Sequence, residues 1–420
     1  MLSSPNFPPE NASIRTALRH AFFWLVAANA VGFLLALLLV APTGGGLLGT
    51  WTYGRWMPLH LNLHLFGWTS LPLVAWLFRL YGVDAIGLTS WGLTAIWAWS
   101  AALLAGSLAW LDGQTSGKIF LDWSGRSLGF FLGAMVLLWG VLAAAWFRGR
   151  RGKAHLLGLL ALGAVPVLLA LAARPEVYPP VNPESGGPTG ASLLGSSLSV
   201  VFLLLLVPRS LGRRRAEGAG RESLYWIVFG LQLAAVPFLE RTVISHREPS
   251  QWIGLGLLLA WIALLPIFYR RYSWSPLERR WLSASLAWLA LLILTGWLTF
   301  LPGLLDAAKF TNVLVAHAHF AMAGFTSTFL LFLAVVLTGG TRPLATGFWW
   351  WNGATLGYVV LMASAGLFEA ADPAWILHPN PTKTSLYTLR LLCGLVLLIV
   401  SARWWLGLLK PHEPQSAANN

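Results

Sequence analysis

Twelve runs of mostly apolar residues recur along the chain, and each can cross a lipid bilayer as a helix. The hydrocarbon core of a bilayer is about 30 Å thick and requires about 20 helical residues. Only 10% of the residues are charged, whereas a soluble domain carries about 25%, so the natural solvent of this chain is lipid. The runs are 17–41, 59–81, 86–111, 127–147, 154–173, 191–207, 223–240, 251–269, 281–301, 309–338, 346–368 and 385–408.

The pattern within these runs predicts the fold class. No run alternates apolar and polar residues with the period of two that a membrane β-barrel requires. The sequence therefore predicts an all-α integral membrane protein with twelve transmembrane helices. We expect one membrane domain at residues 17–408, a polar segment at residues 1–16 and a disordered tail at residues 409–420.

The basic residues of the loops predict the orientation of the helices. If the N-terminus is cytoplasmic, 19 of the 28 Lys and Arg residues lie on the cytoplasmic side, and the other nine, Arg390 among them, lie on the outer side. The strongest basic clusters, at 148–153, 209–215 and 270–280, then fall in alternate loops on that side. We expect a bacterial inner-membrane protein with both termini in the cytoplasm. This topology accounts for the net charge of +13, so we expect contacts with the lipid bilayer and no nucleic-acid binding.

The four most deeply embedded of the nine histidines lie at similar expected depths near the outer face, whereas His20 and His155 lie at inner ends of their runs. His60 is at the outer end of the second run, and His64 follows one helical turn deeper. His317 and His319 lie in the outer third of the tenth run. Hydrocarbon offers imidazole no hydrogen-bond partner, so these positions indicate either a ligand or a partner on a neighbouring helix.

The spacing of His317 and His319 favours haem as that ligand. Residues two apart on a helix differ by about 200° in direction, so the two rings point to nearly opposite sides. Neutral imidazole is a usual axial ligand of haem iron, and two helices can each supply one. One helix with this spacing could therefore serve two haems. Zinc requires three or four ligands that converge on one point, which this spacing does not provide.

Other residues have simpler interpretations. A hydrogen bond between helices is the structural alternative for an embedded histidine, and we interpret His64 in this way. We interpret His246 and His378 as solvated loop residues. The single cysteine, Cys393, excludes an internal disulfide bond and a cysteine-based metal cluster. Tryptophans near the ends of the runs are expected to form an interfacial belt; these are Trp51, Trp56, Trp349, Trp350, Trp351, Trp404 and Trp405.

Two stretches resemble a known family. FTNVLVAHAHFAMAGF (310–325) resembles the tenth helix of haem–copper oxidase subunit I, which carries an Ala-His-x-His motif. YGRWMPLHLNLHLFGW (53–68) is similar to the second helix of C-type oxidases and nitric oxide reductases, with the motif Arg-x-x-Pro-Leu-His-x-Asn. The resemblance implies a twelve-helix bundle of that type. It also implies a low-spin haem b held by His60 and His319, and a second, high-spin haem on His317.

The sequence departs from this family where copper would bind. The family holds copper, or a non-haem iron, with histidines of the sixth and seventh helices. The sixth run and its lead-in contain no histidine, and Arg174 stands at the start of an RPEVY segment where the family has histidine. An arginine cannot bind a cation, so we expect the copper to be absent. A non-haem iron held by Glu176, Glu184 and His246 remains an alternative.

We therefore expect a haem-binding electron-transfer protein that receives electrons from a cytochrome c-type donor or subunit. One alternative is a terminal reductase, an oxidoreductase of the cytochrome c oxidase or nitric oxide reductase type, with O2 or NO as the ligand. Such a reductase consumes protons, and no run carries Asp, Glu or Lys at its middle to deliver them. Another alternative is a transporter, but broken helices and charges at mid-membrane, which transporters usually show, are not evident.

Overall fold

The computed structural model describes residues 11–181, 193–213, 222–240, 247–340 and 342–410. These residues form helices and no β-strand, which confirms the all-α prediction for this part of the chain. Ten of the helices are long and apolar enough to cross a membrane. The sixth and seventh predicted runs form shorter apolar helices, Leu194–Ser210 and Ser223–Leu239. Of the predicted tail at 409–420, Leu409 is the last residue of a helix, and residues 411–420 lie outside the described residues.

The first half of the chain supplies seven α-helices and two other helical segments. Helix α1 begins at Ala12, five residues before the predicted membrane domain. The elements are α1 (Ala12–Val40), η1 (Pro42–Leu48), α2 (Tyr53–Asn62), η2 (Leu63–Thr69), α3 (Ser70–Tyr81), α4 (Thr89–Leu111), α5 (Gly125–Arg148), α6 (Lys153–Ala172) and α7 (Leu194–Ser210).

The second half continues with α8 and ends with α17, the last transmembrane helix. The elements are α8 (Ser223–Leu239), α9 (Pro249–Leu257), α10 (Ala260–Tyr269), α11 (Pro276–Thr299), α12 (Leu304–Ala308), α13 (Asn312–His319), η3 (Phe320–Thr326), α14 (Ser327–Thr338), α15 (Arg342–Thr346), α16 (Phe348–Ala371), η4 (Pro373–Ile376) and α17 (Pro381–Leu409).

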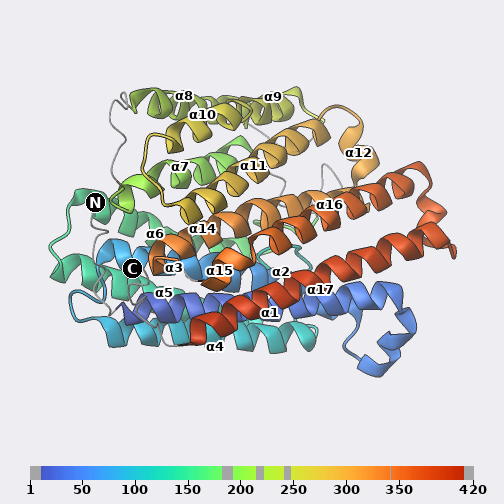
Figure 1. Cartoon of the computed structure of the whole chain (residues 1–420), viewed down its shortest axis with the longest axis horizontal. Coiled ribbons are helices and arrows are strands. Elements are labelled where there is room, and N and C mark those ends of the chain that lie inside the picture. The colour runs from blue at the N-terminus through green and yellow to red at the C-terminus, as the bar shows by residue number, and fades with distance from the viewer. Residues whose placement is uncertain (1–10, 182–192, 214–221, 241–246, 341, 411–420) are drawn as a thin grey trace, which may run out of the picture.

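The helices pack as one bundle in which the two ends of the chain meet. Helices α1 and α17 lie side by side (Figure 1), and the side chain of Asn29 donates a hydrogen bond of 3.0 Å to that of Ser401. Helix α16 packs against both α13 and α17. Helix α14 lies deepest, because every residue from Ser327 to Val336 is buried. The other helices therefore surround α14, which follows His317 and His319 in the sequence.

The tryptophans divide between the surface and the core. Trp349 and Trp350 are exposed, as an interfacial belt requires. For Trp351 and Trp404 the prediction is wrong, since both are only 1% exposed. Their indole N–H groups donate to the carbonyl oxygens of Ala323 and Pro343, each over 3.0 Å. Such a bond lets a buried indole keep its polar group satisfied.

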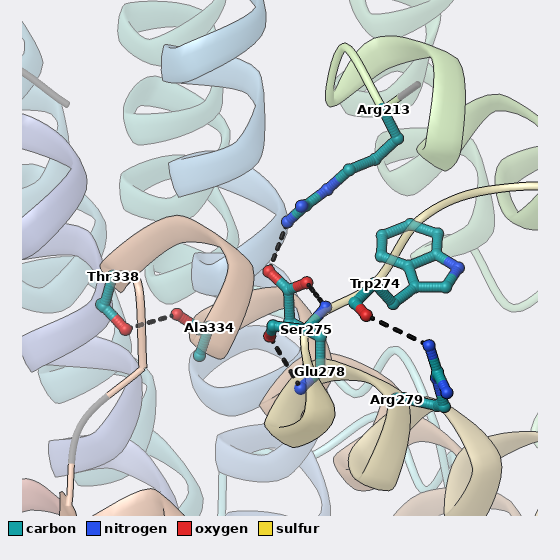
Figure 2. A network of polar contacts seen from close by, with 7 residues as sticks. All are labelled: Arg213, Trp274, Ser275, Glu278, Arg279, Ala334 and Thr338. Atoms are coloured by element: carbon teal, nitrogen blue, oxygen red, sulfur yellow. Dashed lines mark hydrogen bonds and ion pairs between the residues drawn. The ribbon is translucent and has the colours of Figure 1, made fainter. Parts of the chain in front are cut away.

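The predicted basic clusters meet at one end of the bundle. Arg213, which follows α7, forms an ion pair with Glu278 in the first turn of α11 (Figure 2). Glu278 also accepts a hydrogen bond of 2.8 Å from the backbone N–H of Ser275, as part of a capping box. Arg151 lies against Gly82 at the end of α3. Loops far apart in the sequence therefore share one end, in agreement with their predicted alternation.

The helices that carry His60 and His319 both change geometry near these residues, and His64 lies within the changed segment. Helix α2 runs into the π-helical segment η2, and α13 runs into the π-helical segment η3. These are the π-helical segments of the described residues. Each contains a glycine, Gly67 or Gly324, that lies directly against a tryptophan ring of a neighbouring helix. Such segments are rare and occur frequently at functional sites.

A glycine also sets the distance between α13 and α16. A Cβ atom added to Gly366 would lie 2.1 Å from the backbone nitrogen of Val313. The two backbones therefore touch at this point, which only glycine allows. This contact fixes α13, with its histidines, against α16.

We predict that Gly366→Ala destabilises the protein, because the added methyl group must push α13 away from α16. The free energy of unfolding, measured in detergent micelles, should fall by about 1–3 kcal/mol. Gly353→Ala is the matched control in the same helix, since a Cβ there meets no atom within 4 Å. Equal stability of the two variants would show that the backbones do not touch.

Candidate functional site

His60 is held by the first helix. Its Nδ1 lies 2.8 Å from the carbonyl oxygen of Ala28 in α1. A carbonyl can only accept, so Nδ1 carries the proton and the neutral ring keeps a free lone pair on Nε2. One turn further along α1, a Cβ added to Gly32 would lie 2.5 Å from Cε1 of His60. Because Gly32 has no side chain, the imidazole ring of His60 can pack directly against α1.

The other motif residues of α2 anchor the helix. Arg55 donates from Nη1 to the carbonyl oxygen of Leu111 over 2.8 Å, at the C-terminus of α4. A cation is favourable at this end of a helix. Asn62 donates to the carbonyl of Pro58 over 2.8 Å and accepts from the backbone of Asp122 over 3.3 Å. Arg55 and Asn62 therefore position His60 rather than extend the site.

His319 has the same arrangement as His60. Its Nδ1 lies 2.7 Å from the carbonyl oxygen of Val315, one turn earlier in α13. Nδ1 is therefore the donor and Nε2 the free nitrogen. The ring of His319 stacks on that of Tyr358 in α16, with centroids 4.3 Å apart and planes at 29°. Among the described residues, no hydrogen bond reaches Nε2 of either His60 or His319.

A buried arginine completes this side of the site. Arg390 in α17 is 8% exposed and donates from Nε to the hydroxyl of Tyr358 over 2.8 Å. Arg390 is close enough to interact electrostatically with His60 and His319. The two histidines are also close enough to interact with each other. From the sequence, Arg390 was expected only as one of the outer-side positive charges. The signal that could have found it is a charged residue between apolar neighbours inside the last apolar run.

His317 faces a different helix. Its Nδ1 lies 3.4 Å from the hydroxyl oxygen of Thr295 in α11. A Cβ added to Gly296 would lie 3.1 Å from its Cε1. His317 therefore points toward α11 while His319 points toward α16, as the two-residue spacing predicts.

His64 lies beside the pair without joining its hydrogen bonds. Its ring meets that of His60 edge to face, with centroids 4.8 Å apart. It is also within electrostatic reach of His319. No hydrogen bond to His64 occurs within the described part of the chain. The interpretation of His64 as a hydrogen-bonded link between helices is therefore not supported.

His20 shows how a structural histidine looks in this fold. Its Nδ1 lies 2.7 Å from the hydroxyl of Ser100, and its ring packs edge-on against Trp97. The hydroxyl can donate or accept, so this contact selects no tautomer. His60 and His319 differ because a carbonyl fixes the proton and leaves the second nitrogen free.

The residues present fit a haem in chemistry. The side chains of His60, His317 and His319 are half-buried. A metal-binding histidine usually donates its other N–H to a carbonyl or carboxylate, which fixes the tautomer and orients the ring. His60 and His319 both show this arrangement. Nitrogen donors of this kind are suitable axial ligands for haem iron.

The described residues form no cluster of side chains that could hold a non-haem metal. There, no three His, Cys, Asp or Glu side chains meet in a group that could hold an ion. Arg174 is exposed and follows the end of α6. Glu176 lies in the same loop, whereas His246 and Glu184 lie outside the described residues. The alternative of a non-haem iron on these three residues therefore stays a prediction.

Comparisons with known proteins add no family assignment. No model of a known protein family matches the chain, and no curated protein matches it significantly.

We predict that Gly32→Ala lowers stability through the ring of His60. The new methyl group must displace the imidazole and break its bond to Ala28, which should cost about 1 kcal/mol of unfolding free energy. The same substitution in a His60→Ala background should cost less, because the ring is gone. A double-mutant cycle of the unfolding free energies measures this coupling. Equal costs in both backgrounds would contradict the contact.

Proposed function

We propose that the protein is a membrane electron-transfer protein that binds a low-spin haem b between His60 and His319. One observation carries this proposal. Two rings from separate helices, within electrostatic reach of each other, each have Nδ1 bonded to a backbone carbonyl, and no hydrogen bond of the described residues reaches either Nε2. When bound, haem would supply one-electron chemistry, and two imidazole ligands leave its iron no open position.

Arg390 and Tyr358 support this assignment. A buried cation stabilises negative charge, and haem b carries two carboxylates. Arg390 is buried beside both histidines, and its hydrogen-bond partner, the Tyr358 hydroxyl, is neutral. Tyr358 also supports the ring of His319 from α16. These two residues would bind and orient the group that His60 and His319 hold.

A second haem on His317 extends the proposal. His317 faces α11, on another side of α13, so its haem would be separate from the first. One axial histidine leaves the opposite position open, and O2 or NO is a suitable ligand there. The terminal reductase is therefore the second candidate function. It requires a further metal, and the described residues offer no group of side chains for one.

The membrane topology that accompanies this proposal has twelve spans. The two shorter apolar helices, α7 and α8, would complete the ten longer ones. The cluster at 148–153 and the other basic loops would face the cytoplasm, which places both termini there and the histidines near the periplasmic face. A cytochrome c-type donor or subunit on that face would then supply the electrons. This arrangement is that of a haem–copper oxidase subunit I in a bacterial inner membrane.

We predict that His60→Ala and His319→Ala each abolish the low-spin haem spectrum, because each removes one axial ligand. His317→Ala should spare that spectrum and remove only a high-spin component. Optical and electron paramagnetic resonance spectra of the purified variants, with a pyridine haemochrome assay for haem per chain, measure this.

His64→Ala is the matched control, since His64 lies beside His60 but has no bond that fixes its tautomer. It should keep the low-spin spectrum. Loss of that spectrum in His64→Ala, with retention in His319→Ala, would show that the wrong histidine has been paired. A wild-type spectrum in all the variants would refute haem ligation by these helices.

We predict that Arg390→Gln lowers the midpoint potential of the low-spin haem. A nearby positive charge disfavours ferric iron more than ferrous iron, so its removal stabilises the oxidised form. A shift of roughly 60 mV corresponds to a tenfold change in a one-electron equilibrium. Redox titration measures the shift, and Arg403→Gln, an exposed arginine of the same helix, should leave the potential unchanged.

A further inference from the structure

A groove lies between α10 and α11, at the end of the bundle where the basic clusters meet. Its volume is about 670 Å³. One wall follows α10 through Ile262 and Pro266, one turn apart, and ends at Arg270, directly after the helix. The other wall follows two ridges of α11. Arg279, Ser283 and Ala287 form one ridge, and Leu282, Leu286 and Ala290 form the other, each with the four-residue spacing of a helix face.

The groove changes character along its length. Arg270 and Arg279 lie at the mouth, next to the turn that joins the two helices, and both are exposed. Ser283 follows one turn deeper, and beyond it the lining of α11 is wholly apolar. Eleven residues separate Arg279 from Ala290, which corresponds to about 16 Å along the helix. This length is close to half of the bilayer's hydrocarbon thickness of about 30 Å, so the groove spans one leaflet.

Within the described parts of the chain, no carboxylate neutralises the positive charge at the mouth. Of the nearby carboxylates, Glu278 is paired with Arg213 (Figure 2), and Glu222 is paired with Arg209 over 2.6 Å. No carboxylate of the described residues pairs with either Arg270 or Arg279. Arg279 has a weak contact of 3.5 Å with the carbonyl oxygen of Trp274.

The aromatic residues near the mouth present ring surface rather than free polar atoms. The hydroxyl of Tyr269 donates to the carbonyl of Leu204 over 2.9 Å, and that of Tyr272 donates to Glu222. The indole of Trp274 donates to the carbonyl of Tyr269 over 3.0 Å. The two arginines and the Ser283 hydroxyl are therefore the groups that can recognise a polar head.

We propose that this groove binds one anionic phospholipid of the leaflet on that side. Its phosphate would lie between Arg270 and Arg279, and an acyl chain would follow Leu282, Leu286 and Ala290 into the membrane. The planar guanidinium of arginine can donate two parallel hydrogen bonds to one phosphate group. This inference goes beyond the proposed function and does not depend on haem, because it rests on α10 and α11 alone.

The test is native mass spectrometry of the purified full-length protein, titrated separately with phosphatidylglycerol and phosphatidylcholine. We expect the wild type to bind phosphatidylglycerol preferentially. The double variant Arg270→Gln/Arg279→Gln should bind it roughly 30-fold more weakly, the factor expected for two basic residues at a membrane surface. Ala287→Phe, which narrows the apolar part without a change in charge, should also weaken binding.

The control Arg280→Gln/Arg403→Gln removes the same charge from exposed arginines outside the groove. The Arg280 guanidinium lies over the ring of Phe348 instead, 5.3 Å from its centroid. This variant should bind phosphatidylglycerol as the wild type does. Equal weakening in both double variants, equal affinity for phosphatidylcholine, or displacement of the lipid by a quinone analogue would each overturn the proposal.

Discussion

The hydrogen bond from a histidine Nδ1 to a backbone carbonyl determines which ring nitrogen of His60 and His319 is left free to bind a ligand. In hydrocarbon a polar side chain has only the protein as its partner. His60 takes the carbonyl of Ala28, and His319 takes that of Val315. Each bond satisfies one nitrogen, fixes the tautomer and turns the other nitrogen away from the backbone. The close packing at Gly32, the anchors of α2 and the stacked Tyr358 all serve to hold these two rings in place.

The sequence predicted those features that depend on local geometry. The two-residue spacing of His317 and His319 determined that their rings would face different helices, because helical rotation alone decides it. Apolar runs of sufficient length likewise predicted the long helices. Features that depend on tertiary contact were missed. Arg390 was counted as an outer charge, and Trp351 and Trp404 as lipid anchors, because neither composition nor spacing tells whether a side chain near a helix end turns inward.

The missed residues share a physical reason. A long amphipathic side chain can extend toward the interface or toward a buried acceptor, and both outcomes occur at the same position along a helix. The choice depends on whether a neighbouring helix presents an acceptor, such as the carbonyl of Ala323 for Trp351. That acceptor lies in another run, and only the packing of the bundle reveals it.

The charge of the site bears on what it holds. Burial of a cation is costly unless a partner compensates it. Arg390 is buried between helices, and its hydrogen-bond partner is a neutral tyrosine. Glu369 is the nearby acid, but it is engaged by Asn312 and Tyr387. The proposed ligand would therefore bring carboxylates to Arg390 and use the free Nε2 atoms of the two histidines. Haem meets both conditions, whereas a transported anion would use the arginine and leave the two fixed imidazoles without a role.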